Sequence, residues 1–266
     1  MRATHADADA ARAANLLTGA RRLVVFTGAG MSQESGVPTF RDAQTGLWAS
    51  FNPEELATPE AFRRHPARVF GWYLWRARLV RTVEPHAGYA ALVHLSADLE
   101  SCVVVTQNVD GLHQRAGSSD VIELHGRLDA FRCFDRGHPF DASRLATLGS
   151  LPEGDVDPPP CPTCGSPIRP GVVWFGEMLP ADAVARANDA VTQCDALLVV
   201  GTSGLVYPAA ELPWLALDRG AKLIEVNPTP TPFSSRAHVS WRATAATALP
   251  ALAQALEQRA NPQLQP

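Results

Sequence analysis

The sequence predicts an α/β fold: a doubly wound, Rossmann-like parallel sheet that carries a small inserted module. Short runs of apolar, mostly β-branched residues alternate with longer segments of helical periodicity. Apolarity is continuous within each run, which is typical of strands covered by helices on both faces of a parallel sheet. Such alternation implies right-handed crossovers. The expected strands are residues 23–30, 102–108, 121–126, 196–203 and 222–227, and the expected helices are residues 66–82, 85–97, 180–193, 207–219 and 245–258.

Two regions interrupt this alternation. Residues 31–65 form a long connection with short helical pieces of its own. Residues 131–172 are rich in proline, glycine and cysteine and contain almost no core-forming side chains, as in "EGDVDPPPCPTCGSPIRPG". We therefore expect the second region to be the inserted module.

Composition excludes several classes of protein. The 266 residues are 46% hydrophobic and 19% charged, an ordinary globular profile with ample length for a full core. The net charge of -4 argues against a dedicated nucleic-acid binder. No apolar run approaches the ~20 residues that a membrane helix needs, and the first 22 residues lack the pattern of a signal peptide. Five cysteines cannot all pair within one chain, so we expect a reducing, cytoplasmic location, with oligomeric state open.

The first expected strand leads into a glycine loop. Ligands of doubly wound sheets bind at the carboxyl ends of the strands, and "VVFTGAG" begins as a dinucleotide site should. Glycines there let backbone N–H groups approach a pyrophosphate near a helix N-terminus. Gly36 is out of register for the usual fingerprint, so a tight turn between strand and helix is the alternative for this stretch by itself.

Longer strings extend this interpretation. "GAGMSQESGVPTFR", "TQNVDGLHQRAG", "ELHG", "WFGE", "GTSGLVYPA" and "EVN" follow one another in that order. Together they closely resemble the sirtuin family of NAD-dependent protein deacylases, over about residues 20–255. The resemblance implies NAD as cofactor and acylated-lysine proteins as substrates. It implies backbone or polar contacts to the cofactor from Gly28, Ala29, Gly30, Ser32, Thr39, Phe40, Arg41, Gln107, Asn108, Asp110, Gly201, Thr202, Ser203, Asn227 and Ala245.

The sequence pattern, together with the resemblance, predicts a domain arrangement. An N-terminal helical extension would span 1–19 and a C-terminal tail 259–266. A Rossmann-like NAD-binding domain would comprise 20–130 and 173–258, and a zinc-ribbon-like module 131–172. Inside the larger domain, 31–65 would cover the cofactor and 66–97 would be a helical segment lining the acyl pocket.

His125 and Asn108 are the expected catalytic residues. His125 ends an expected strand in "IELHG", and a neutral imidazole accepts a proton near pH 7. By resemblance, the acyl oxygen of the modified lysine attacks the ribose carbon that nicotinamide leaves. His125 then deprotonates a ribose hydroxyl, which attacks the resulting alkylimidate, and water completes the reaction to free lysine and O-acyl-ADP-ribose after nicotinamide has left. His113, in "DGLHQRAG", is interpreted as a structural residue.

The cysteines give half of a clear metal site. Cys161 and Cys164, in "CPTCG", have the spacing of two zinc ligands. The second pair common in sirtuins is incomplete, because Arg136 follows Cys133 where a cysteine is expected. We expect Cys133, Cys161 and Cys164 to hold a structural zinc, with Asp135 or His138 completing it. A module held by packing without metal is the alternative.

Tyr73 and Arg76 predict the acyl group. Three apart in "GWYLWRARLV", they share one helix face, and simple amphipathicity would explain that. One sirtuin branch, however, has Tyr-x-x-Arg here and removes succinyl and malonyl groups as well as, or better than, acetyl. A hydroxyl and a guanidinium fork suit a buried carboxylate. By resemblance, the substrate peptide adds as a strand between two loops, which contribute Val173, Phe175, Gly176, Glu177 and Val206.

The expected function is therefore NAD-dependent removal of succinyl, malonyl and acetyl groups from protein lysines. A protein mono-ADP-ribosyltransferase is one alternative, although the Tyr73–Arg76 pair has no evident use in it. A non-catalytic NAD- or peptide-binding protein is another, disfavoured by the presence of His125 and Asn108 at their matched positions. A zinc-ribbon nucleic-acid binder is disfavoured by the acidic balance.

Overall fold

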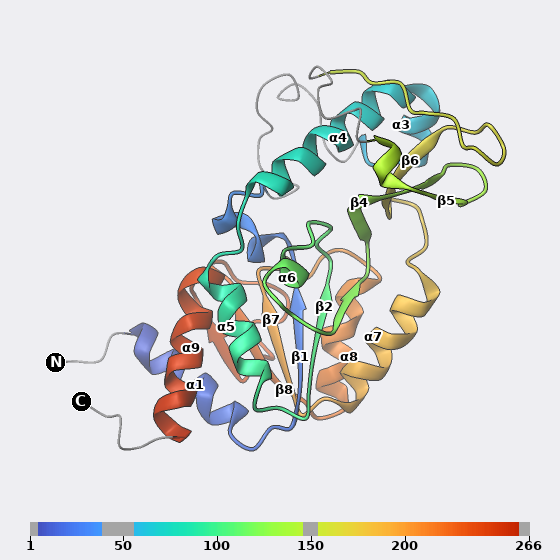
Figure 1. Cartoon of the computed structure of the whole chain (residues 1–266). Helices are drawn as coiled ribbons and strands as arrows, with labels where there is room; N and C mark the ends of the chain where they lie inside the picture. The colour runs from blue at the N-terminus through green and yellow to red at the C-terminus, as the bar shows by residue number, and fades with distance from the viewer. Residues whose placement is uncertain (1–4, 39–55, 146–153, 261–266) are drawn as a thin grey trace.

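The computed structural model describes residues 5–38, 56–145 and 154–260 (Figure 1). Its main sheet has six strands in the order β3-β2-β1-β7-β8-β9, and every pair of neighbours is parallel. This order reverses direction on either side of β1, as in a doubly wound sheet, and the predicted fold class is confirmed. The strands are β1 (Arg22–Thr27), β2 (Ser101–Thr106), β3 (Val121–Glu123), β7 (Ala196–Val200), β8 (Lys222–Val226) and β9 (Val239–Trp241).

Both faces of this sheet are buried. Along β1, Leu23 and Val25 pack into one hydrophobic cluster, and Val24 and Phe26 pack into another on the opposite face. This two-sided burial explains why the strand sequences are apolar without alternation. The first face is covered by α1 (His5–Leu17), α5 (Ala87–Ser96) and α9 (Ala245–Ala260), and the second by α7 (Ala181–Gln193) and α8 (Leu212–Asp218).

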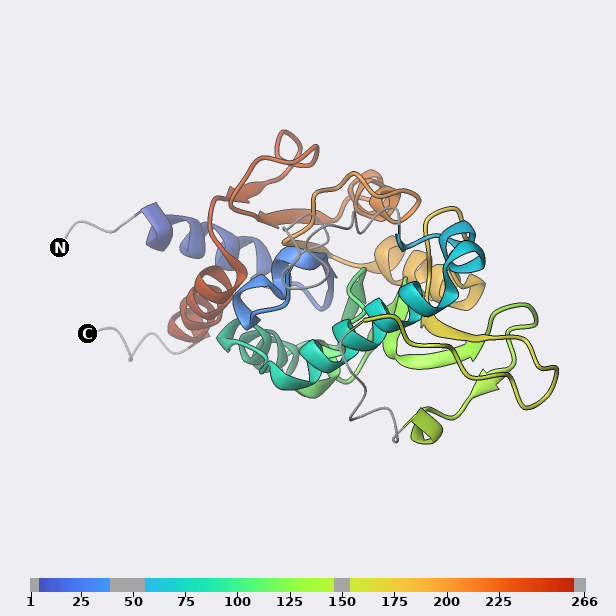
Figure 2. The same cartoon turned by 90° about the horizontal axis from the view of Figure 1, so that it is seen from above.

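A second, smaller lobe lies above the carboxyl ends of the main strands (Figure 1). Its antiparallel sheet has the order β5-β4-β6, and two helices pack with it around a cluster of aromatic side chains. Figure 2 shows α4 running across the molecule beside this lobe. The elements of this lobe are α3 (Pro59–Arg64), α4 (Pro66–Thr82), β4 (Gly126–Cys133), β5 (Pro139–Phe140) and β6 (Ile168–Val172). The short α6 (Leu112–Arg115) follows β2 and packs with the main sheet through Leu112.

Several expected boundaries differ from the structure. The strands end one to three residues early, because the glycines and polar residues behind them form the binding loops. The expected helix 207–219 is a 3-10 turn at Ala209–Glu211 followed by α8, which begins beside Pro213. The edge strand β9 was not expected, and neither were β4, β5 and β6 in and before the module. The second sheet starts at Gly126, five residues before the predicted module.

Among the described residues, no helix combines the length and the apolar character needed to cross a membrane.

Candidate functional site

The glycine loop after β1 lies directly against the loop after β7. The Gly28 N–H donates to the Val200 carbonyl at 3.1 Å, and the Gly30 N–H donates to the Gly201 carbonyl at 2.8 Å. A Cβ on Gly28 would stand 2.8 Å from the Thr202 Cβ, and one on Gly30 would stand 2.8 Å from the Gly201 Cα. Real Cβ atoms do not approach so closely, so glycine is required at both positions.

These contacts change one expectation. Gly28, Ala29 and Gly30 were predicted to offer their backbone to a phosphate, but the N–H groups of the two glycines already donate to carbonyl oxygens of the neighbouring loop. The glycines therefore bring the two loops together.

Ser32 forms the centre of a buried polar cluster. Its Oγ donates to Asp110 Oδ2 at 2.5 Å and accepts from Asn108 Nδ2 at 2.9 Å. The Tyr89 hydroxyl, 2.9 Å away, completes its bonding. Burial raises the pKa of Asp110. Three of the predicted cofactor residues are thus joined, while Tyr89 was missed because it lies inside an ordinary apolar stretch of α5.

The ends of β2, β7 and β8 meet at Thr202. Gln107 Nε2 donates to Thr202 Oγ1 at 2.9 Å, and Asn227 Nδ2 donates to the Thr202 carbonyl at 2.7 Å. Ser203 follows, half-buried. The predicted cofactor residues on three strands therefore share one edge of the sheet. Ala245 begins α9, where Glu34 from the glycine-loop segment accepts the N–H of Ala246 at 2.8 Å. Thr39, Phe40 and Arg41 lie outside the described residues.

His125 is held as a neutral imidazole. Its Nδ1 lies 2.9 Å from the Gln107 carbonyl oxygen, and a carbonyl only accepts, so Nδ1 carries the hydrogen. Nε2 then presents its lone pair. Burial lowers the pKa of His125, which the bond to Gln107 partly offsets. The imidazole is therefore unprotonated at neutral pH.

His113 has a different environment. It is buried, its Nε2 lies 3.0 Å from Thr27 Oγ1, and its ring stands edge-on to Tyr89. Burial lowers its pKa to about 3. Thr27 in turn donates to Thr106 on the neighbouring strand at 2.8 Å. His113 thus helps to join β1, β2 and α6, which supports the structural role predicted for it.

Tyr73 and Arg76 lie together on α4. Tyr73 is buried, and burial raises its pKa to about 12. The Arg76 guanidinium carbon stands 5.7 Å from the Tyr73 ring centroid and 4.9 Å from that of Trp72. Burial lowers the pKa of Arg76, and the charges of Tyr73 and Asp110 oppose that shift. Tyr73 is thus buried and Arg76 half-buried on the same helix, with the charge of Asp110 acting on Arg76.

Two loops present apolar side chains to solvent near β6 and β7. Phe175 and Met178 follow β6 and are 44% and 92% exposed, and Tyr207 after β7 is 63% exposed. The Val173 N–H donates to the His125 carbonyl at 2.8 Å, and the Phe175 N–H to that of Ala57 at 2.9 Å. The first loop is thereby tied to the His125 segment.

The predicted loop residues differ in how they are used. Gly176 has a φ of 84°, the left-handed conformation that favours glycine. The Val206 carbonyl accepts the N–H of Ala210 at 2.9 Å. Glu177, predicted to contact the substrate, pairs with Arg169 and accepts the Trp174 N–H at 2.8 Å. The Glu177 carboxylate thus stabilises the loop after β6 through the Trp174 backbone.

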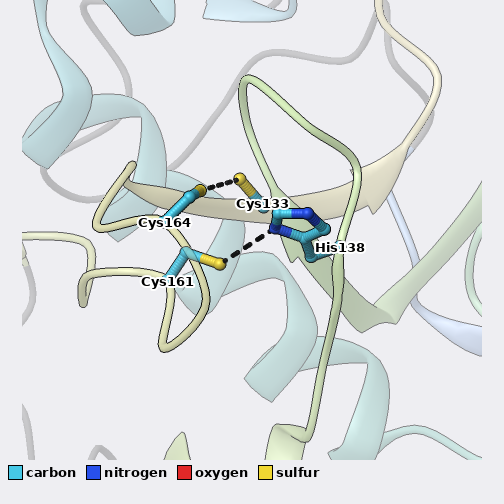
Figure 3. A group of neighbouring side chains, drawn as sticks. All are labelled: Cys133, His138, Cys161 and Cys164. Carbon is cyan, nitrogen blue, oxygen red and sulfur yellow. Dashed lines mark hydrogen bonds between the residues drawn. The ribbon is translucent and has the colours of Figure 1, made fainter.

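Four side chains of the small lobe converge as metal ligands (Figure 3). Cys133 ends β4, His138 precedes β5, and Cys161 and Cys164 lie in the loop before β6. The sulfurs of Cys133 and Cys164 are 3.4 Å apart, and Cys161 Sγ is 3.5 Å from His138 Nδ1. All four ligand atoms lie within 4.8 Å of one another.

This donor set fits a structural zinc ion. Zinc–sulfur bonds of about 2.3 Å place tetrahedral ligands about 3.8 Å apart, close to the observed spacing. His138 completes the site, since the Asp135 carboxylate accepts from Ser166 Oγ at 2.5 Å instead. The Arg136 N–H points to the Cys133 sulfur at 3.4 Å. Three protein thiolates and one imidazole leave no open position for catalysis.

Comparison with known proteins gives a consistent result. Residues 28–208 match the Sir2 family. The chain is 52% identical over 215 residues to NAD-dependent protein deacylase 1 of Pseudomonas aeruginosa, covering 81% of this chain and 86% of that protein. It is 51% identical over 237 residues to the NAD-dependent protein deacylase of Mycobacterium tuberculosis, covering 88% and 98%.

Solved structures agree with these sequences. The crystal structure of a Sir2 homologue in complex with NAD superposes with a TM-score of 0.82 at 40% identity, over 92% of this chain and 93% of that one. A Sir2 structure with a deacetylated peptide and acetyl ADP-ribose gives a TM-score of 0.76 at 31% identity, over 91% and 96%. With the glycine loop, the neutral His125 and the four-ligand cluster in their places, these matches show that the chain belongs to the Sir2 family.

Proposed function

We propose that this chain is an NAD-dependent protein-lysine deacylase that removes succinyl and malonyl groups, and acetyl groups as well. Its products are nicotinamide, free lysine and O-acyl-ADP-ribose. The observation that carries the acyl preference is the Tyr73–Arg76 pair on α4, in which Tyr73 is buried, Arg76 is half-buried and the charge of Asp110 acts on the Arg76 guanidinium. The deacylase activity itself is supported by the relatives and by the site described above.

Different cofactor residues along the carboxyl ends of the strands suit different parts of NAD. The Ala29 N–H and the loop at Gly201–Ser203 suit the phosphates, and Asn227 with the start of α9 suits the adenosine end. The Ser32 cluster places Asn108 and Asp110 for the nicotinamide carboxamide, which needs both donors and acceptors. NAD, when bound, supplies the ribose carbon that receives the acyl oxygen, with nicotinamide as the leaving group.

His125 moves the proton. The Gln107 carbonyl fixes its Nδ1–H, so Nε2 accepts a proton from a ribose hydroxyl. The lowered pKa keeps that nitrogen unprotonated at neutral pH. The peptide lies between the loops at 173–177 and 205–207, where the exposed Phe175 and Tyr207 cover the entering lysine. Pairing through backbone groups implies loose selectivity for the flanking sequence.

The carboxylate of a succinyl or malonyl group would be costly to bury without partners. Arg76 offers a charged, planar donor, and the Tyr73 hydroxyl offers a second. A charge-assisted hydrogen bond contributes about 1.5–3 kcal/mol, so two bonds favour succinyl over acetyl by ~10²-fold or more. A small acetyl group still enters, since it leaves Arg76 as it is in the structure.

The test is a paired assay with NAD and one peptide that carries either succinyl-lysine or acetyl-lysine, with kcat/KM measured by mass spectrometry. We expect a strong succinyl preference. Arg76→Met should raise KM for the succinyl peptide steeply and lower the succinyl-to-acetyl ratio of kcat/KM by at least ~10-fold. Equal losses of kcat/KM on both peptides would show that Arg76 does not bind the acyl carboxylate. A mass gain of one ADP-ribose on the peptide would indicate a transferase instead.

A further inference from the structure

Trp174 contacts both helices of the small lobe, α3 through Phe62 and α4 through Tyr73, and both of its N–H groups donate hydrogen bonds. The indole Nε1–H donates to the Tyr73 hydroxyl at 2.9 Å, and the backbone N–H donates to Glu177 Oε2 at 2.8 Å. The side chain is 2% exposed. Phe62 packs on it, with ring centroids 5.4 Å apart. The indole therefore sits in one orientation, determined by polar contacts at two of its atoms.

A buried ion pair holds the face of this indole. The Arg169 guanidinium carbon stands 3.3 Å from the Trp174 ring centroid, and Arg169 is itself 2% exposed. Both terminal nitrogens of Arg169 bond to the Glu177 carboxylate, and Nη2 also donates to the Val172 carbonyl at 2.8 Å. A buried guanidinium is tolerated when it is paired and hydrogen-bonded in this way. Arg169 thus packs on the ring of Trp174, and Glu177 accepts its backbone N–H.

This arrangement determines which way the Tyr73 hydroxyl points. An indole nitrogen can only donate, so the phenol oxygen must be the acceptor in the bond to Trp174. The phenol hydrogen is then directed away from the indole. A ligand carboxylate needs that hydrogen, because an ionised carboxylate only accepts. Arg76 lies three residues along the same helix, so the two donors can meet one carboxylate.

We propose that Trp174 is a positioning residue that sets the preference for acyl groups ending in a carboxylate. Arg169 and Glu177 hold Trp174 in place, and Trp174 fixes the direction of the Tyr73 hydroxyl. The inference rests on the proposed function of the Tyr73–Arg76 pair. An acetyl group has no terminal carboxylate to receive the phenol hydrogen. The orientation of that hydrogen therefore affects kcat/KM for the succinyl-lysine peptide. It does not affect kcat/KM for the acetyl-lysine peptide, on which Trp174 acts through packing alone.

The experiment is a double-mutant cycle on the full chain with NAD. Trp174→Phe, Tyr73→Phe and the double variant are assayed on succinyl-lysine and acetyl-lysine forms of one peptide. Trp174→Phe removes the indole N–H and keeps an aromatic ring. We expect the succinyl-to-acetyl ratio of kcat/KM to fall about 3- to 10-fold, through KM for the succinyl peptide. The double variant should have the same succinyl-to-acetyl ratio of kcat/KM as Tyr73→Phe alone, because Trp174 acts through the Tyr73 hydroxyl.

Two further variants separate this role from packing. Trp241→Phe removes another buried indole, in β9 of the main sheet, and should leave the ratio at its wild-type value. Glu177→Gln keeps the indole but weakens the contacts that hold it, and should lower the succinyl-to-acetyl ratio by a smaller factor than Trp174→Phe. Thermal unfolding of each variant shows whether it folds, and Glu177→Gln carries the test if Trp174→Phe does not.

The outcomes are distinct. A wild-type enzyme without succinyl preference overturns the proposed function, and this inference falls with it. A wild-type enzyme that prefers succinyl, with variants at Trp174 and Glu177 that lower both substrates equally, overturns the inference alone. So does an effect of Trp174→Phe on the ratio that is as large in the Tyr73→Phe background as in the wild type.

Discussion

The imidazole Nδ1 of His125 lies 2.9 Å from the backbone carbonyl oxygen of Gln107. This contact joins His125 to the end of β2, the strand that Asn108 also follows. It fixes the tautomer that leaves Nε2 as the acceptor, and it does so through a backbone group that no substitution of Gln107 removes. Second contacts of this kind commonly determine which ring nitrogen of a histidine reacts.

The first prediction concerns the pH dependence of catalysis. Burial lowers the pKa of His125 below its usual value near 6.5, so the neutral form persists to lower pH. The acid limb of kcat/KM should therefore lie below pH 6.5, with activity lost as pH falls through the lowered pKa. His125→Ala should cost ~10²–10⁴-fold in kcat. Rates measured from pH 4.5 to 8, with return to pH 7.5 as a control for unfolding, check this. A limb at or above pH 6.5 would contradict it.

Acid stability provides a second prediction. His113 has a pKa of about 3 in the folded protein and about 6.5 when unfolded. The unfolded state binds the proton more readily, so stability is full above pH 6.5 and is lost as pH falls toward 3. At pH 5 the loss from this residue is about 2 kcal/mol. In His113→Gln, the drop in unfolding free energy between pH 7.5 and pH 5 should be smaller by about that amount.

The measurement is urea unfolding at the two pH values. His65→Gln, at an exposed histidine between α3 and α4, serves as the control and should keep the wild-type difference. An unchanged difference in His113→Gln would mean that His113 is not the group that titrates.

A third prediction concerns the Ser32 cluster. Ser32→Ala leaves the Asp110 oxygen, the Asn108 amide and the Tyr89 hydroxyl each short of one bond. Leaving one such buried group without its partner costs about 1–3 kcal/mol. We expect a higher KM for NAD and kcat lower by ~10-fold or more. Tyr89→Phe removes one of the same bonds but keeps those to Asn108 and Asp110, so its loss should be smaller. Equal losses would show that the Asn108 and Asp110 contacts do not matter.

Local sequence patterns predicted much of this structure. The helix at 66–82 is found with those bounds because Pro66 opens it and Val83 leaves it in extended conformation. The polar residues behind the strands meet at one edge because parallel strands end together there. What local patterns could not supply are contacts across the chain. The Trp174–Tyr73 bond joins residues 101 apart, and Trp174 looks like any core aromatic until α4 packs against the small lobe.

The metal cluster shows the same limit in another form. Cys133, Cys161 and Cys164 were predicted as ligands, and the fourth was left open between Asp135 and His138. The sequence did not decide for His138, which stands five residues from Cys133, outside the usual pairing of ligands. Only the turn between β4 and β5 brings it to the sulfurs, and the backbone bond from the Cys133 N–H to the His138 carbonyl, at 2.8 Å, closes that turn. Three-residue β9 was missed for a related reason, since so short a strand has no period to detect.

The last prediction is that the purified chain holds one zinc per molecule through three thiolates and His138. Metal analysis measures the content, and the cobalt-substituted protein reports the number of thiolates in its absorption spectrum. Cys161→Ser should lose the metal and lower Tm by roughly 10 °C, because the binding free energy of a structural zinc is folding free energy. His138→Cys should retain zinc, now with four thiolates, whereas Asp135→Ala should leave both content and spectrum unchanged. Loss of zinc in Asp135→Ala with retention in His138→Ala would assign the fourth ligand to Asp135 instead.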